Sequence, residues 1–145
     1  NSFGANLVTA AVDDTGIVRV RECVSYYDVG RVLNLAMVES QIVGGSVQAI
    51  GQVLTEAALY DENSQILGGS LADAGLLTAM EIPRFVVKFA DSRSDLPHGA
   101  KGVGESPTIG VPPALLRAIE RAVGKRLTRT PISLEELARA PEVAG

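Results

Sequence analysis

The longest helical candidate of the sequence, residues 36–59, has a face made only of glutamine and glycine. Apolar residues spaced three and four apart form two stripes on the rest of the helix, which predicts that most of it is buried. A glycine inside a helix costs about 1 kcal/mol relative to alanine. Several on one face therefore predict a group lying close to the backbone. The stripes are Val43, Val47, Ile50, Leu54 and Ala57, and Val38, Ile42, Ala49 and Val53; the third face holds Gln41, Gly44, Gly45, Gln48 and Gln52.

The other segments predict a small α+β fold. Residues 7–12 and 17–25 are β-rich and flank a turn at 13–16, which is typical of a hairpin. Residues 85–89 are a third strand candidate, and 126–130 could form a last strand. Residues 112–123 predict a second amphipathic helix ending at Gly124. Ser133 is expected to cap a short helix reaching Arg139, with Glu136 at the capping-box position.

The remaining segments are expected to connect these elements. Residues 26–34 and 91–104 are polar and predict loops, and 61–64 predict a turn. Residues 65–69 are read as a short strand or extended segment, and 70–83 as helix or irregular chain. Strands and helices in this order favour a two-layer packing of short, mainly antiparallel strands against two main helices.

Composition excludes several classes of function. A chain of 145 residues fits one domain, and its net charge of -4 argues against nucleic acid as a partner. Apolar runs are too short to span a membrane. The single cysteine, Cys23, excludes an internal disulfide and agrees with a cytoplasmic location. The start at Asn1 has no signal-peptide features, so the chain is read as part of a larger fold, trimmed or made as a separate subunit.

The first chemical candidate is Glu105, which follows the glycine-rich run 98–104. In one interpretation it is an ordinary first-turn acid that complements a helix dipole. In the other, the glycines admit a ligand and Glu105 is a general base whose pKa is raised by burial. A phosphate-binding loop is excluded, because Lys101 is followed by Gly102 rather than by Ser or Thr. The dinucleotide fingerprint also fails, because no third glycine follows at the required step.

The second candidate is the glutamine and glycine face of the long helix. It could pack against another backbone, or its amides could bind a flat, polar or phosphorylated ligand, since glutamine offers both a donor and an acceptor. His98 is the only histidine, so no histidine-based metal site can form within the chain. His98 is expected in a loop and Cys23 in the core.

Several motifs in this order resemble one family. They are the run 28–34 (DVGRVLN), the run Gln41 to Gly45 with Gln48, the run Lys101 to Glu105 (KGVGE), and the run 110–114 (GVPPA). The opening run 2–5 (SFGA) is similar as well. Together they resemble the C-terminal part of the large, molybdopterin-binding subunit of the xanthine dehydrogenase, aldehyde oxidase and carbon monoxide dehydrogenase family. The resemblance covers nearly the whole chain and implies that residues 1–145 are one portion of the cofactor-binding domain.

The resemblance implies a mechanism and a set of site residues. In the family's hydroxylases, the glutamate matching Glu105 takes a proton from an oxygen ligand of molybdenum, and that oxygen attacks the substrate. Gln41 matches a glutamine that contacts the pterin. Gly44 and Gly45 belong to the same helix face, and the backbone from Gly102 through Val103 to Gly104 is expected near the metal centre. The chain itself is expected to supply no metal ligand.

The resemblance also implies partners. The cofactor, molybdopterin or its cytosine dinucleotide form, would be shared with the remainder of the large subunit. Iron–sulfur clusters and FAD would lie on partner subunits, and the substrate would be a small molecule. Ser40 departs from the glycine that many relatives have before the glutamine. The chain could supply a base and one wall but not a complete site, so activity in isolation is not expected. The alternative is a non-catalytic assembly domain of such a complex.

Overall fold

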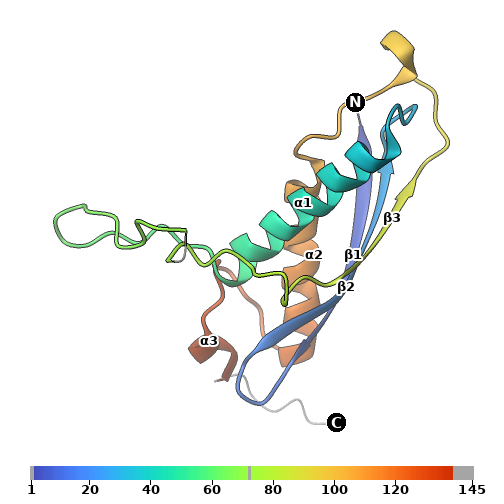
Figure 1. Cartoon of the computed structure of the whole chain (residues 1–145). Coiled ribbons are helices and arrows are strands. Elements are labelled where there is room, and N and C mark those ends of the chain that lie inside the picture. Colours follow the sequence, from blue (N-terminus) through green and yellow to red (C-terminus); the bar gives the residue numbers. More distant parts are fainter. Residues whose placement is uncertain (1, 72, 139–145) are drawn as a thin grey trace.

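Two long strands and a third, shorter strand form one mixed sheet (Figure 1). The computed structural model describes residues 2–71 and 73–138. Strands β1 (Phe3–Val12) and β2 (Val18–Asp28) pair antiparallel, with a bulge between Thr9 and Ala10. The predicted turn between them is confirmed, because the Asp13 carboxylate accepts hydrogen bonds from the backbone N–H groups of Thr15 and Ile17. The strands extend beyond the predicted ranges, since β2 continues through residues predicted as loop.

The third strand is parallel to the second. Strand β3 (Arg84–Phe89) pairs with β2 and gives the order β1-β2-β3. A parallel pair requires a crossover connection, and here the crossover contains helix α1 (Leu35–Leu54). The predicted α+β class with mainly antiparallel pairing is confirmed, and the parallel pair is an addition to it.

Both main helices cover the same face of the sheet (Figure 1). Helix α2 (Ser106–Val123) lies against β1 and against α1. It ends at Gly124, which has the left-handed conformation expected of a C-terminal cap. Apolar residues from the sheet and both helices meet in the main core, which agrees with the helical spacing of apolar residues along α1 and α2. The fully buried members are Cys23, Ala49, Ile50, Val53, Val111, Leu115 and Ile119.

Two predicted helix boundaries are wrong. Helix α1 ends at Leu54 rather than at residue 59. At its end, the backbone N–H groups of Thr55 and Glu56 both bond to the carbonyl of Gly51. Helix α2 begins at Ser106, six residues before the predicted start, because Pro112 and Pro113 lie inside it instead of opening it.

The C-terminal region differs as well. Residues 126–130 form no strand, and the N–H of Leu127 bonds to the Glu120 carboxylate. The short helix is α3 (Leu134–Ala138), and the Ser133 hydroxyl accepts from the N–H of Glu136 as predicted. The predicted end of this helix, Arg139, lies outside the described residues.

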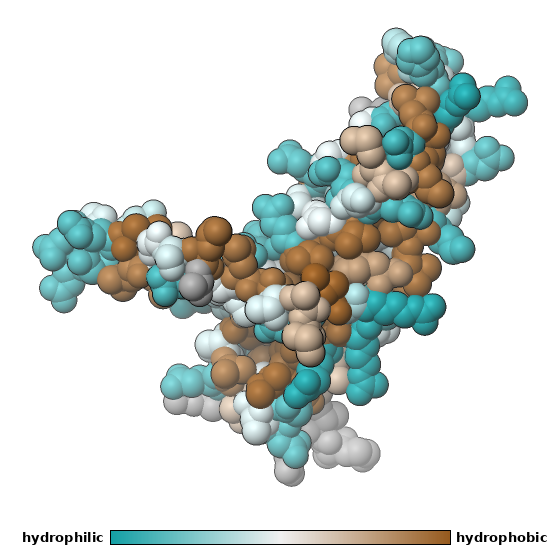
Figure 2. All heavy atoms as spheres, in the orientation of Figure 1, coloured by the Kyte–Doolittle hydropathy of each residue, from teal (hydrophilic) through white to brown (hydrophobic). Residues whose placement is uncertain are grey.

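A long connection, residues 56–83, which we call the arm, projects away from the rest of the molecule for much of its length and then returns to pack on the core at Leu77 (Figure 1). Its described residues contain no helix and no strand beyond a bridge between Tyr60 and Ile66. Many of its apolar side chains are exposed, including those of Leu71 (78%) and Met80 (93%). The hydrophobic surface along the arm in Figure 2 shows that apolar side chains remain uncovered there.

Candidate functional site

The two candidates from the sequence meet at one place. A hollow of about 600 Å³ lies between the polar face of α1 and the start of α2. We call it the amide hollow. Of the residues predicted for the site, Gln41, Gly44, Gly45, Gly104 and Glu105 line it, although the two groups lie about sixty positions apart in the sequence. The remaining lining residues are Ser40, Gln48, Gln52 and Thr108.

A direct hydrogen bond joins the two candidates. The side-chain amide nitrogen of Gln41 donates to the carbonyl oxygen of Gly104 at 2.8 Å. One amide donor of Gln41 is therefore used to hold the loop before α2. Its amide oxygen accepts no hydrogen bond from the described residues, so this acceptor is available to a second molecule in the hollow.

Glu105 is the N-cap residue of α2, but its side chain does not cap the helix. Its carbonyl, rather than its carboxylate, accepts from the N–H of Thr108 at 3.1 Å and from the Thr108 hydroxyl at 2.8 Å. The carboxylate makes no cap hydrogen bond and is exposed at the edge of the amide hollow. The general-base interpretation requires burial, and the chain by itself does not supply it.

Two glycines at the hollow are not required by the fold. At Gly44 and Gly104, a Cβ atom would meet no heavy atom of the described chain within 4 Å, and neither residue has a positive φ angle. Gly102, in the same loop, also has open space at this position. An alanine would therefore fit in the chain alone, and inside a helix it would be more stable than glycine. Open space at a glycine backbone is what a second molecule in close contact requires.

Gly45 has a different role from its neighbour. A Cβ atom on Gly45 would lie 3.3 Å from the side chain of Pro107, which is buried at the start of α2. Close packing between the helices therefore explains this glycine, as one of the two sequence interpretations held. The glutamine and glycine face is thus divided, with Gly45 against α2 and Gly44 open.

Gly102 and Val103 do not line the hollow. The carbonyl of Gly102 accepts from the Ser2 hydroxyl at 2.5 Å, and Val103 packs against a small buried cluster of Tyr27, Val29 and Ile42. They anchor the loop rather than form its open surface. Ser40 and Thr108 were not predicted to line the site, and Gln48 and Gln52 were predicted only as members of the glutamine and glycine face. For Gln48 and Gln52 the signal was present, since both share the helix face of Gln41.

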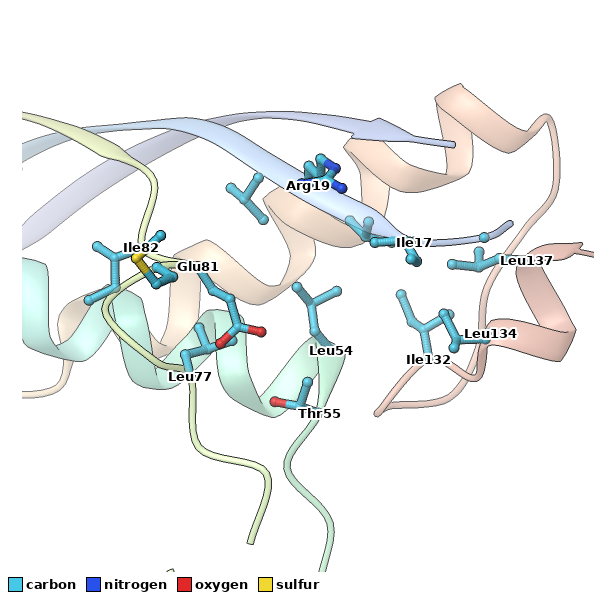
Figure 3. Close-up of a pocket in the computed structure, with 14 residues that line it drawn as sticks. Ile17, Arg19, Leu54, Thr55, Leu77, Glu81, Ile82, Ile132, Leu134 and Leu137 are labelled. Atoms are coloured by element: carbon cyan, nitrogen blue, oxygen red, sulfur yellow. The ribbon is translucent and has the colours of Figure 1, made fainter. Parts of the chain in front are cut away.

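A second hollow, which the sequence did not predict, is mainly apolar. It has a volume of about 470 Å³ and lies between the start of β2, the end of α1, the arm and α3. Figure 3 shows Leu54, Leu77 and Ile132 around it, with Arg19 and Glu81 as charged members. Four segments that are separate in the sequence line this hollow, so no local sequence pattern predicts it.

Cys23 and His98, the remaining candidates, lie outside both hollows. Cys23 is buried, and burial raises the pKa of its thiol. His98 is exposed and lies in a short 3-10 turn, Pro97–Gly99. Across residues 2–71 and 73–138, no three His, Cys, Asp or Glu side chains gather in a way that could hold a metal ion. None of the helices described combines the length and the hydropathy needed to cross a membrane.

Comparisons with known proteins give a consistent result. Residues 1–83 match the family model of the molybdopterin cofactor-binding domain. The chain is 36% identical over 124 residues to the carbon monoxide dehydrogenase large chain of Afipia carboxidovorans, which covers 83% of this chain and 15% of that protein. It is 37% identical over 141 residues to the gamma subunit of the 6-hydroxypseudooxynicotine dehydrogenase complex of Paenarthrobacter nicotinovorans, covering 93% of this chain and 18% of that protein.

Solved structures agree in fold. The aldehyde oxidoreductase from Desulfovibrio gigas superposes with a TM-score of 0.85 at 31% identity, covering 96% of this chain and 15% of that one. A copper- and molybdenum-containing carbon monoxide dehydrogenase superposes with a TM-score of 0.78 at 34% identity, covering 85% of this chain and 16% of that one. The chain therefore spans less than a fifth of the length of each of these relatives.

Proposed function

This chain belongs to the molybdopterin cofactor-binding domain family of the molybdenum hydroxylases, and from that premise we propose that it forms one wall of a molybdenum–pterin site in an oxidoreductase. In this proposal residues 1–145 are the C-terminal portion of the cofactor-binding domain. The substrate is a small molecule that is hydroxylated or oxidised at the same site.

One observation carries the proposal. Five of the seven residues predicted for cofactor contact and for catalysis, drawn from two motifs far apart in the sequence, surround a single hollow. Their grouping follows from the packing of α1 against the start of α2, and not from the sequence order of the motifs.

The residues present fit a flat, polar cofactor. Gly44 and Gly104 have open space where a side chain would begin, which allows a rigid ring system to approach the backbone. Glutamine amides beside them offer donors and acceptors that suit a pterin edge. Gln41, Gly44 and Gly104 would hold the group, and when bound the group would supply the redox chemistry of the reaction.

In the proposed reaction Glu105 is the general base. Its carboxylate makes no hydrogen bond within the helix cap and is therefore free to accept a proton from the oxygen nucleophile. Because Glu105 is exposed in this chain, the proposal requires the remainder of the large subunit to cover the hollow. Exclusion of water would then raise the pKa of the carboxyl group and make it a stronger proton acceptor.

The same proposal extends to the assembly. The cofactor, as molybdopterin or its cytosine dinucleotide, is shared with the rest of the large subunit, and iron–sulfur clusters and FAD lie on partner subunits. The complex is cytoplasmic, and this chain alone is inactive. The family supports the molybdopterin assignment, and the short share of each relative's length that this chain spans supports the need for the remaining subunits.

Filling the hollow tests the proposal. Gly44→Leu in the assembled enzyme should abolish binding of molybdenum and pterin, because the new side chain occupies the open space at the backbone. Ala122→Leu is the matched control, since Ala122 is an exposed residue of α2 that does not line the amide hollow. Metal analysis and pterin fluorescence of the purified proteins give the result. Full cofactor content in Gly44→Leu would refute the proposed wall.

A non-catalytic assembly domain is the alternative function. The exposed apolar arm favours it, because uncovered apolar surface of this extent marks an interaction site. Purification from the native host separates the two proposals. Molybdenum, iron and flavin that co-elute with the chain support the oxidoreductase, whereas a metal-free complex with its partners supports the assembly domain.

A further inference from the structure

Asp28, the last residue of β2, is bonded to three separate parts of the chain. Its carboxylate accepts from the ammonium group of Lys101 at 2.6 Å, from the hydroxyl of Ser92, and from the N–H of Gly30 at 3.1 Å. Neither charged side chain is freely solvated, since 20% of Asp28 and 12% of Lys101 is exposed. The hydrogen bonds from these donors lower the pKa of Asp28 to about 2, so the carboxylate stays charged at neutral pH.

Backbone hydrogen bonds reinforce the same junction. The N–H of Lys101 donates to the carbonyl of Val29, and the N–H of Arg31 donates to the carbonyl of Gly99, both at 2.8 Å. Gly30 and Ala100 form an antiparallel bridge. The segment after β2 and the segment before the glycine loop are therefore held side by side.

Each residue from Lys101 to Gly104 has its own contact with the rest of the fold. Lys101 bonds to Asp28, Gly102 accepts from Ser2, Val103 packs in a buried cluster, and Gly104 accepts from Gln41. A loop with two glycines in four residues would otherwise have high conformational freedom. The next residue in the chain is Glu105.

We infer that Asp28 and Lys101 are positioning residues that fix the loop 101–104 and thereby set where the Glu105 carboxylate lies at the amide hollow. This inference rests on the proposed function of that hollow. The ion pair acts at the end of the loop away from α2, and Gln41 acts at the end next to it. With both ends held, the backbone of Glu105 keeps one place relative to α1.

A second ion pair of the molecule provides a matched control. Arg84 lies 3.5 Å from Glu22 and joins β3 to β2, but 76% of the Arg84 side chain is exposed. An exposed pair of this kind contributes little to stability. It also lies away from the glycine loop, so its loss should not affect the position of Glu105.

Hydrogen exchange on the full chain tests the inference without any cofactor. Lys101→Met should speed exchange of the bonded amides at positions 31, 101 and 106 on the order of tenfold, because their hydrogen bonds to Gly99, Val29 and Val103 depend on the junction that the ion pair holds. Arg84→Met should leave those amides unchanged, and Lys101→Arg should restore protection. If Lys101→Met is poorly folded, Asp28→Asn replaces it, since the amide oxygen can still accept from Gly30. Unchanged exchange at positions 31, 101 and 106, or an equal increase throughout the chain, would overturn the inference.

A spin label at position 105 gives a second readout that global stability does not affect. Glu105→Cys carries the label, since Cys23 is buried. The label should gain a mobile spectral component on Lys101→Met and none on Arg84→Met. An identical spectrum in all three backgrounds would mean that the ion pair does not position residue 105. Neither measurement uses turnover, so a failure of the catalytic role of Glu105 would leave these results intact.

Discussion

The side-chain amide nitrogen of Gln41 donates to the carbonyl of Gly104 at 2.8 Å, and so connects helix α1 to the residue immediately before Glu105. This bond connects the helix face proposed to contact the pterin with the residue proposed to accept a proton. It gives Gln41 two functions, because one amide nitrogen is used within the chain while the amide oxygen remains available to a ligand. Cofactor contact and base position are therefore coupled through one side chain.

Removal of that donor should affect function more than stability. Gln41→Met keeps the length of the side chain but cannot donate to Gly104. We expect the turnover number of the assembled enzyme to fall about tenfold, while the free energy of unfolding falls by about 1 kcal/mol, the usual contribution of one hydrogen bond. Gln65→Met is the control, since Gln65 is an exposed glutamine of the arm that does not line the amide hollow. Equal turnover in both variants would contradict the coupling.

Substitution by alanine should affect stability differently at the two adjacent glycines of α1. Gly44→Ala should stabilise the chain by about 0.5–1 kcal/mol, because alanine favours a helix and nothing in the described chain obstructs its Cβ. Gly45→Ala should give no such gain, because its Cβ would press on Pro107 at 3.3 Å. Thermal unfolding of the two variants measures the difference. A lower melting temperature for Gly44→Ala than for Gly45→Ala would show that the space at Gly44 is not open.

A left-handed glycine near the Asp28 junction provides a steric prediction. Gly30 has a φ of 62°, and a Cβ there would clash with the carbonyl oxygen of Gly99. Gly99 also has a positive φ of 71°, but its Cβ would meet nothing closer than 3.7 Å. Gly99→Ala should cost about 1–2 kcal/mol for the conformation alone, and Gly30→Ala clearly more. Chemical denaturation compares them, and equal losses would contradict the assigned clash.

The Asp28 carboxyl group should make the stability of the fold depend on pH. Its pKa is lowered from 3.8 to about 2 in the folded chain, chiefly by the hydrogen bond from Lys101. A group with a lowered folded pKa stabilises the fold above its unfolded pKa, and this contribution disappears as the pH falls through the folded value. The stability difference between the parent and Asp28→Asn should therefore be constant above about pH 4 and shrink between pH 4 and 2. Urea denaturation across that range tests it, and a difference independent of pH would exclude the ion pair as its cause.

The sequence predicted the elements that depend on local patterns. The hairpin follows from alternating residues around a turn, and the end of α2 follows from Gly124. The start of α2 was not predictable in this way, because Pro112 suggests a helix start and only packing against α1 shows that the helix begins earlier. The parallel pairing of β3 with β2 also depends on contacts across a long crossover, which periodicity does not encode.

The site was predictable as two motifs but not as one place. Gln41 and Glu105 were both candidates, yet only the crossing of α1 with the start of α2 brings them to the same hollow. The sequence could not show that Gly44 is open while Gly45 is closely packed, because this depends on which of them faces Pro107. The exposed position of Glu105 and the ion pair between Asp28 and Lys101 are likewise properties of the packed chain.

The central claim is that Glu105 accepts a proton at the molybdenum–pterin site, and turnover of a Glu105→Gln variant in the fully assembled enzyme tests it most directly. Glu135→Gln, at an exposed acid in α3, is the control. We expect Glu105→Gln to retain molybdenum and its partner subunits but to lose at least about a hundredfold in the turnover number, the usual contribution of a general base. Turnover equal to that of Glu135→Gln, with the cofactor fully present, would contradict the account.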